Sequence, residues 1–207
     1  MTPKPEPAYF DAKVREPGVR WLREHGLPTS GAAPPKTEMS PYWRACLDDL
    51  HTAYGGVCAY VCVYIEKVTG ARSADHFVAK SSAIDQAYEW TNYRLACSAM
   101  NSRKREFDDV LDPFVLADGT FELDLVTGKI SPSPHLGSDA KLLAQATIDR
   151  LHLDDPECRG LRSTYFTDYL EHHISPQYLE RRCPFVWREV RRQNAFRKEL
   201  ATNAPVA

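Results

Sequence analysis

The spacing of apolar and polar residues divides the chain into helical and strand-like segments. Before the Gly55-Gly56 pair, four apolar residues recur at the spacing of one helix face: Trp43, Cys46, Leu47 and Leu50. Residues 57–65 are rich in β-branched and aromatic side chains, which favours a strand or a turn leading into one. Residues 114–130 alternate apolar and acidic positions between turn signals, as in a half-buried hairpin, and helical stripes begin at Ser138 and Pro156. The pattern predicts an α+β fold.

The two ends of the chain differ in composition from its middle. Residues 1–39 contain seven prolines and one short helical candidate, so we interpret them as a proline-rich N-terminal arm packed on the domain. Residues 40–173 are expected to form the main domain, with its core at 57–109. Residues 174–207 are expected to be a basic helical segment that breaks near Pro184.

Composition narrows the class of protein only a little. A chain of 207 residues suggests one domain, or one domain with an appended lobe. A net charge of -2 does not indicate a nucleic-acid binder, although a local basic face can act where the overall charge does not. No apolar run reaches membrane-spanning length and no signal peptide is evident, so we expect a cytoplasmic protein without a membrane partner. Its six cysteines are then expected to be thiols.

The stretch from Ser73 to Asp109 contains five polar residues suited to one reaction: Asp75, His76, Asn92, Asn101 and Lys104. Cleavage of a phosphodiester needs a general base to take a proton from water. It also needs a divalent cation to absorb the charge on the phosphate and the departing oxygen. These requirements match the residue types in this stretch, which predicts a metal-dependent phosphodiesterase site.

Each residue type suggests a role. His76 is suited to be the general base, and Asp75 beside it is a hard oxygen ligand for a cation. Asn101 begins a short helical segment and offers an amide oxygen as a second ligand. Lys104 lies three residues further on the same helix face, where an ammonium would meet a phosphate oxygen.

The order Asp-His, then Asn, then Asn-x-x-Lys resembles the HNH (ββα-metal) endonucleases, a family that includes the HNH domain of Cas9. The wording DHFVAKS followed by YEWTNYRLACSAMNSRK is similar to a bacterial HNH subfamily associated with ATPase partners in phage-defence loci. The likeness covers roughly residues 50 to 165 and includes LDPF at 111–114 and ATIDRLHLDD at 146–155.

The resemblance implies a fold and a mechanism. It implies a ββα-metal core with an added hairpin, cleaving DNA with Mg²⁺ or Mn²⁺ in defence against phage or foreign DNA, beside an ATPase partner. His76 would deprotonate water for in-line attack, and Asp75 and Asn101 would hold the metal. Asn92 would hold the loop that orients His76, and Lys104 would assist electrostatically.

The cysteines depart from the pattern of the family that the chain resembles. Related HNH proteins have two CxxC pairs that hold a structural zinc, whereas here Val61 and Met100 occupy two of the four positions. Only Cys58 and Cys97 remain in register. We therefore predict no structural zinc, with the remnant thiols packed as small apolar groups. The alternative is a distorted site completed by Cys62 or His51.

Basic residues gather near the C-terminus. This segment contains Arg181, Arg182, Arg188, Arg191, Arg192, Arg197 and Lys198, with Phe196 among the residues expected to anchor it. Such a run is a solvated face or, beside a nuclease core, a clamp on the phosphate backbone.

Two other functions stay open at this point. The first is a catalytically silent HNH-like module that binds nucleic acid or a partner protein, and the second is a ribonuclease.

Overall fold

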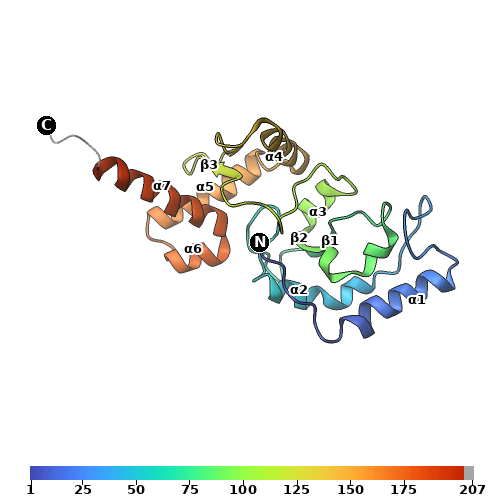
Figure 1. Ribbon diagram of the computed structural model, residues 1–207. Helices are drawn as coiled ribbons and strands as arrows, with labels where there is room; N and C mark the ends of the chain where they lie inside the picture. Colours follow the sequence, from blue (N-terminus) through green and yellow to red (C-terminus); the bar gives the residue numbers. More distant parts are fainter. Residues whose placement is uncertain (203–207) are drawn as a thin grey trace. The chain divides into compact units, whose positions relative to one another are not determined.

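The structure is a computed structural model that describes the backbone of residues 1–202 and the side chains of residues 1–194. It is a mixed α+β fold, as the sequence predicts (Figure 1). Its α-helices are α1 (Glu16–Glu24), α2 (Leu47–Ala53), α3 (Ser98–Lys104), α4 (Ser138–Leu151), α5 (Pro156–Leu170), α6 (Pro176–Arg182) and α7 (Pro184–Thr202). Short π- or 3-10-helical turns are η1 (Asp11–Arg15), η2 (Tyr42–Cys46), η3 (Ile84–Tyr88) and η4 (Trp90–Asn92). The strands are β1 (Arg72–His76), β2 (Tyr93–Cys97), β3 (Phe121–Leu123) and β4 (Ile130–Pro132).

The chain forms two compact units. The first contains Met1–Val61 and Ile65–Ala117, and the second contains Cys62–Tyr64 and the chain from Asp118 onward. This division differs from the three segments expected from composition, because residues 1–39 belong to the same unit as the strands β1 and β2. The segment boundaries inferred from the sequence stay a prediction.

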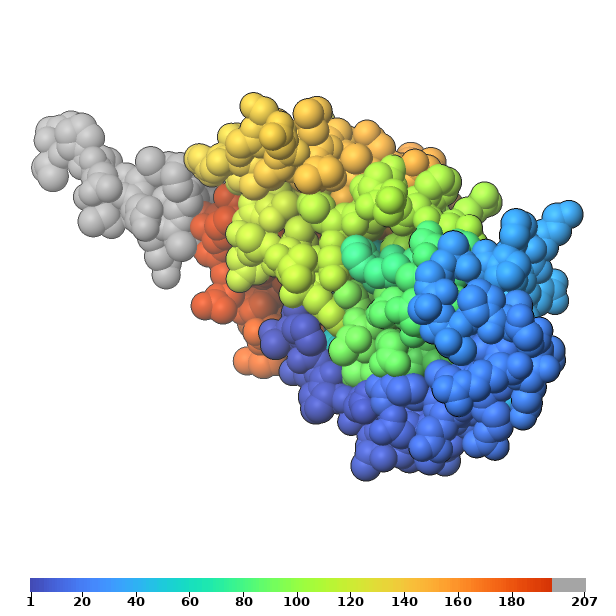
Figure 2. Space-filling model, turned by 45° about the vertical axis from the view of Figure 1, so that its right-hand side comes forward, coloured from blue at the N-terminus to red at the C-terminus, as the bar shows by residue number. Residues whose placement is uncertain are grey.

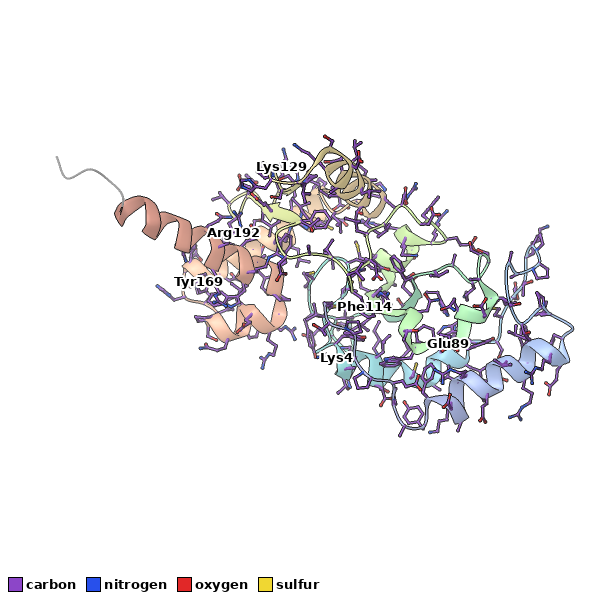
Figure 3. The ribbon with its side chains drawn as sticks, viewed as in Figure 1. Lys4, Glu89, Phe114, Lys129, Tyr169 and Arg192 are labelled. Atoms are coloured by element: carbon purple, nitrogen blue, oxygen red, sulfur yellow. The ribbon has the colours of Figure 1, made fainter. Side chains whose placement is uncertain are left out.

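The N-terminal residues pack on the rest of the first unit. In Figure 2 the blue N-terminal residues lie against green residues of the same unit. Gly18 on α1 faces the ring of Tyr88, and a Cβ there would come within 2.3 Å of the ring carbons, so only glycine permits this approach. Arg15 pairs with Glu89, which Figure 3 labels, and the indole of Trp90 donates to the carbonyl of Lys4 at 2.7 Å. These contacts make the arm part of the body.

A strand, a loop, a second strand and a helix follow one another in the first unit. Strand β1 pairs antiparallel with β2, and α3 begins at the residue after β2 and packs on both strands. The register places Asp75 opposite Arg94 and His76 opposite Tyr93, at the end of the ladder. The sheet is short, so residues at its end reach the loop and the helix.

Residues 57–65, expected to form a strand or a turn leading into one, form a turn and isolated bridge residues rather than a strand. The amide of Ala59 donates to the carbonyl of Leu95 at 2.8 Å. The side chains of residues 57–61 are buried, as their apolar character predicts, with Val61 at 8% exposure. Met100 on α3 is buried as well, at 3% exposure. Gly55 and Gly56 follow the end of α2 with φ of 59° and 71°, so the chain enters residues 57–61 through a left-handed turn.

The second unit combines a hairpin with helices. Strands β3 and β4 pair antiparallel, and Phe121 and Leu123 are buried, which confirms the half-buried hairpin. Asp155 and Ser175 cap α5 and α6 by accepting from backbone amides, and a proline follows each cap. No helix within the described residues is long and apolar enough to span a membrane.

Candidate active site

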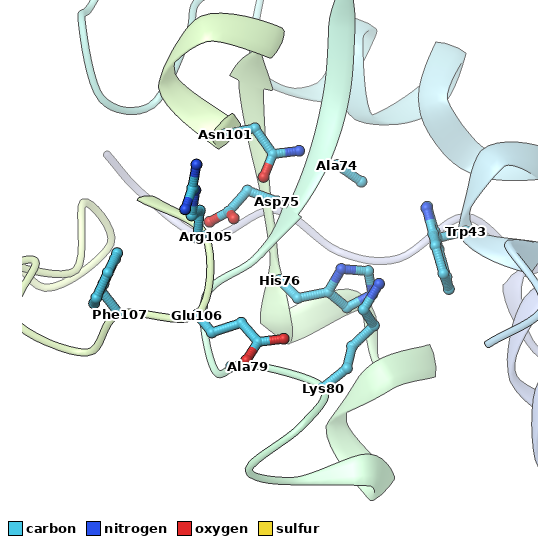
Figure 4. A pocket seen from close by; sticks show the side chains of 10 residues that line it. All are labelled: Trp43, Ala74, Asp75, His76, Ala79, Lys80, Asn101, Arg105, Glu106 and Phe107. Atoms are coloured by element: carbon cyan, nitrogen blue, oxygen red, sulfur yellow. The ribbon is translucent and has the colours of Figure 1, made fainter. Parts of the chain in front are cut away.

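A cavity of about 630 Å³ opens beside the end of β1, in the first unit. Figure 4 shows the ten side chains that line it, among them three of the predicted site residues: Asp75, His76 and Asn101. Asp75 and His76 are the last two residues of β1, and Asn101 is in the middle of α3. The structure therefore brings these three together, whereas Asn92 and Lys104 do not line the cavity.

One carboxylate oxygen of Asp75 has partners within the fold, and the other has none among the described residues. It is 2% exposed, and its Oδ2 accepts from the hydroxyl of Tyr60 and lies 3.8 Å from the ammonium of Lys104. Burial raises the pKa of the Asp75 carboxyl, and Lys104 and Tyr60 act in the opposite direction. Its Oδ1 accepts no hydrogen bond from any residue that the structure describes.

The amide of Asn101 has a defined orientation. The hydroxyl of Ser73 donates to the carbonyl of Ala96 at 2.9 Å, so its oxygen must accept from the Nδ2 of Asn101 at 3.1 Å. This leaves the amide oxygen of Asn101 without a hydrogen-bond donor among the described residues. In Figure 4 that oxygen points toward the carboxylate of Asp75.

The Asp75 and Asn101 oxygens suit a hard divalent cation. Mg²⁺ is commonly bound by one or two protein oxygens, with waters and substrate phosphates completing its octahedron. Within residues 1–194, no group of three or more histidine, cysteine or acidic side chains is placed to hold a metal. A site of one carboxylate and one amide fits a cation that shares its ligands with a substrate.

His76 is fixed as a neutral imidazole. Its Nε2 donates to the carbonyl of Ala87 at 2.9 Å, and the rings of Trp43 and Tyr93 pack edge-on against it at 4.7 and 5.1 Å. Burial, reinforced by the charge of Lys80, lowers the pKa of His76 to about 3. At neutral pH its Nδ1 therefore has a lone pair, and no described residue donates to it. The lone pair leaves Nδ1 free to take a proton, although so low a pKa makes the imidazole a weak base in this buried position.

Asn92 closes the loop between the two strands. Its Oδ1 accepts from the amide of Val78 at 2.8 Å, and its Nδ2 donates to the carbonyls of Val78 and Gln86 at 3.0 and 2.9 Å. The loop so closed includes Ala87, whose carbonyl fixes His76. These bonds fit the role expected of Asn92, which is to hold the loop. An effect of Asn92 on catalysis stays a prediction.

Lys104 lies behind the cavity rather than in it. Its side chain is 0% exposed, and its ammonium donates to the carbonyl of Phe77 at 2.8 Å and to that of His76 at 3.3 Å. In this arrangement the ammonium supports the end of β1 and lies 3.8 Å from Asp75 Oδ2. The contact of Lys104 with a phosphate stays a prediction.

Two other cations line the cavity, and the sequence analysis missed both. Lys80 lies four residues after His76, with its ammonium 4.3 Å from the centre of the Trp43 ring, and burial lowers its pKa. Arg105 ends α3 with φ of 50° and ψ of -124°, a conformation that non-glycine residues rarely adopt. In the sequence, only the position of Lys80 within DHFVAK indicated that it could reach the site. Nothing in the sequence indicates that Arg105 has a positive φ.

The two cysteines of the expected knuckle remnant lie together. The Sγ of Cys58 donates to the Sγ of Cys97 at 4.0 Å, and the backbone amide of Cys97 donates back to the Sγ of Cys58 at 3.4 Å. Cys62 belongs to the second unit, and the ring of His51 is hydrogen-bonded to the carbonyl of Ile65 at 2.8 Å. Among the described residues, no group of three or more histidine, cysteine or acidic side chains that could hold a metal includes this pair. The prediction of no zinc stays a prediction.

The predicted basic clamp, in the second unit, divides into two groups. Arg188 donates to the carbonyl of Phe121, and Arg192 pairs with Glu189 at 2.7 Å. Glu189 is 0% exposed and also accepts from the amide of Leu123, so both arginines neutralise a buried charge. Figure 3 labels Arg192 at this place.

The remaining described arginines of this segment are not paired with Glu189. Arg182 stacks on the ring of Tyr64 at 3.9 Å, whereas Arg181 and Arg191 are exposed. The side chains of Phe196, Arg197 and Lys198 lie outside the described residues. Among the described arginines of the expected clamp, Arg181 and Arg191 are exposed and are not paired with Glu189, whereas Arg192 is exposed but paired with it.

Neither the family models nor the curated proteins with which the chain was compared give a match. The likeness to HNH endonucleases therefore rests on the residue pattern within roughly residues 50 to 165.

Proposed function

We propose that this chain is a divalent-metal-dependent endonuclease of the HNH type that cleaves DNA. One observation supports it most: two oxygens without protein donors, on Asp75 and Asn101, share a cavity with the neutral imidazole of His76. The order β1, loop, β2 and α3 fits the ββα-metal core that the resemblance implies.

In the proposed mechanism, His76 receives a proton at Nδ1 from the attacking water. The bond from its Nε2 to the carbonyl of Ala87 keeps the other nitrogen directed at that water. Tyr60 and Lys104 hold one carboxylate oxygen of Asp75, so that the other oxygen and the amide oxygen of Asn101 are presented to Mg²⁺ or Mn²⁺. When bound, the cation would absorb charge on the phosphate and on the departing 3′ oxygen.

Lys80 and Arg105 take the electrostatic role first assigned to Lys104. Both line the cavity, so a phosphate placed between the metal ligands and His76 would lie near two cations. Glu106 also lines the cavity, and its charge partly offsets the lowering of the Lys80 pKa by burial. Lys104 is a positioning residue in this scheme, because its ammonium contacts Asp75 and two backbone carbonyls.

The resemblance also supplies the biological setting of the proposal. We propose a role in defence against phage or foreign DNA, with an ATPase as partner protein. The accessible arginines Arg181 and Arg191 would add contacts to the DNA backbone.

A plasmid assay tests the proposal. The full-length chain is incubated with supercoiled plasmid and Mg²⁺ or Mn²⁺, with and without EDTA, and with a matched RNA in parallel. We expect nicking or linearisation that requires the metal and is lost in His76→Ala but kept in His25→Ala. Cleavage of RNA alone would replace the DNA assignment with a ribonuclease. Binding of plasmid without cleavage, with and without a co-expressed ATPase, would favour the catalytically silent alternative.

A further inference from the structure

The thiols of Cys58 and Cys97 face each other across a gap between two segments far apart in sequence. Cys58 lies in the turns that follow α2, and Cys97 is the last residue of β2, directly before α3. Their sulfur atoms are 4.0 Å apart, and two hydrogen bonds join the residues, one from thiol to thiol and one from amide to sulfur. A disulfide requires about 2.05 Å, so a shift of side chains over about 2 Å would bring the atoms to bonding distance.

The two thiols differ in a way that suits sequential oxidation. Cys58 is 0% exposed, and burial raises its pKa, whereas Cys97 is only half-buried. The hydrogen bond from Cys58, together with amides of α3, lowers the pKa of Cys97 to about 6. Cys97 is therefore the thiolate that meets an oxidant, and Cys58 is the neighbour that completes the reaction.

We propose that Cys58 and Cys97 form a reversible oxidation site, at which a hydroperoxide converts the two thiols into an intramolecular disulfide. The proposal does not depend on nuclease activity, because neither cysteine lines the cavity of Asp75, His76 and Asn101.

The chemistry balances with a hydroperoxide as the oxidant. The thiolate of Cys97 attacks the outer oxygen of the peroxide, the O–O bond breaks, and the alcohol or water leaves after taking a proton. Cys97 is then a sulfenic acid. The sulfur of Cys58 attacks the sulfur of Cys97, the S–O bond breaks, and water departs with the thiol proton. Two electrons pass from the thiols to the peroxide, and a dithiol reductant reverses the change by exchange.

The disulfide would join two segments that contact the proposed site. Tyr60, two residues after Cys58, donates to Asp75, and Asn101 lies four residues after Cys97 on α3. A bond between the two cysteines would therefore fix the support of both predicted metal ligands.

Peptide mapping of the wild-type chain tests the site directly. The reduced full-length protein is treated with a small excess of hydrogen peroxide, blocked with N-ethylmaleimide and digested. We expect a Cys58–Cys97 linked peptide, a loss of two thiols from the six present, and full recovery with dithiothreitol. The other four cysteines, Cys46, Cys62, Cys158 and Cys183, serve as the internal control and should be blocked as thiols.

Three results would overturn the proposal. One is a disulfide between Cys62 and Cys183, or any other pair, in place of the expected linkage. Another is oxidation of Cys97 to a sulfinic acid that dithiothreitol does not reverse, with Cys58 still a thiol. The third is near-stoichiometric zinc in the reduced protein that protects both cysteines from the peroxide. Cys97→Ser, which cannot form the linkage, should retain its remaining five thiols under the same treatment, because the thiolate that reacts first with the peroxide is then missing.

Discussion

Two regions of the chain are rich in polar side chains and differ in whether the hydrogen-bonding atoms of those side chains already have partners within the fold. In the first unit, Asp75, Asn101 and His76 each have one atom facing a cavity with no partner among the described residues. In the second unit, Arg188 donates to the carbonyl of Phe121, and Arg192 pairs with the buried carboxylate of Glu189. Hydrogen-bonding atoms that face a cavity without a protein partner therefore mark the candidate site better than polar side chains as such.

The largest expected effect is the loss of the proposed general base. His76→Ala should lower the cleavage rate by about 10²- to 10⁴-fold, because a base contributes in the transition state more than in binding. Initial rates of plasmid cleavage measure this, and affinity for DNA should stay within about twofold in a binding assay. Exposed His25 provides the control His25→Ala. Equal rates in His76→Ala and wild type would remove His76 from the mechanism.

The arginines of the second unit should prove structural where they neutralise Glu189. The double variant Arg188→Gln/Arg192→Gln leaves that buried carboxylate without cationic partners and should lower the free energy of unfolding by about 3 kcal/mol. Chemical denaturation measures the change. Arg181→Gln/Arg191→Gln is the matched control, since it removes the same charge from exposed positions. Equal stabilities of the two double variants would contradict the division into two groups.

The burial of His76 makes stability depend on pH. Its pKa is about 3 in the folded chain and about 6.5 in the unfolded chain, so between these values only the unfolded chain takes up the proton. Stability is therefore lost as the pH falls, by about 2 kcal/mol between pH 7 and pH 5. Denaturation at both pH values, compared with His76→Gln, isolates this part. An identical pH dependence in His76→Gln would show that other groups cause it.

The smallest effect concerns the exposed arginines. Arg181→Gln/Arg191→Gln should weaken DNA binding by about tenfold at low salt and reduce the slope of log affinity against log salt by about 2. Fluorescence anisotropy at several salt concentrations measures both quantities. A slope identical to that of the wild type would leave these residues as an ordinary solvated face.

Much of the candidate site was predictable because its chemistry is encoded locally. Asp75 and His76 are adjacent, and Asn101 begins a run of helix formers, so their convergence follows from a strand, a loop and a helix. The fate of Lys104 was not predictable, because helical spacing places it on the face of Asn101 but does not say how deeply it is buried. Its ammonium reaches the carbonyls of His76 and Phe77, which are distant in sequence.

The pairing of Arg192 with Glu189 had one local signal in the sequence. Glu189 lies three residues before Arg192, which is a helical ion-pair spacing. The reason that Glu189 is buried is not local, because it accepts from the amide of Leu123 in the hairpin. Composition alone therefore predicted a basic surface, whereas Arg188 and Arg192 pair with a buried carboxylate.

A metal titration of activity tests the central claim most directly. Cleavage by wild type, Asn101→Ala and the neighbouring control Ser102→Ala is measured across a range of Mn²⁺ concentrations. Removing one of two protein ligands should raise the Mn²⁺ concentration for half-maximal activity by about tenfold or more, while Ser102→Ala should match wild type. Overlaying curves for Asn101→Ala and wild type would show that the unpaired oxygens of Asp75 and Asn101 do not form a metal site.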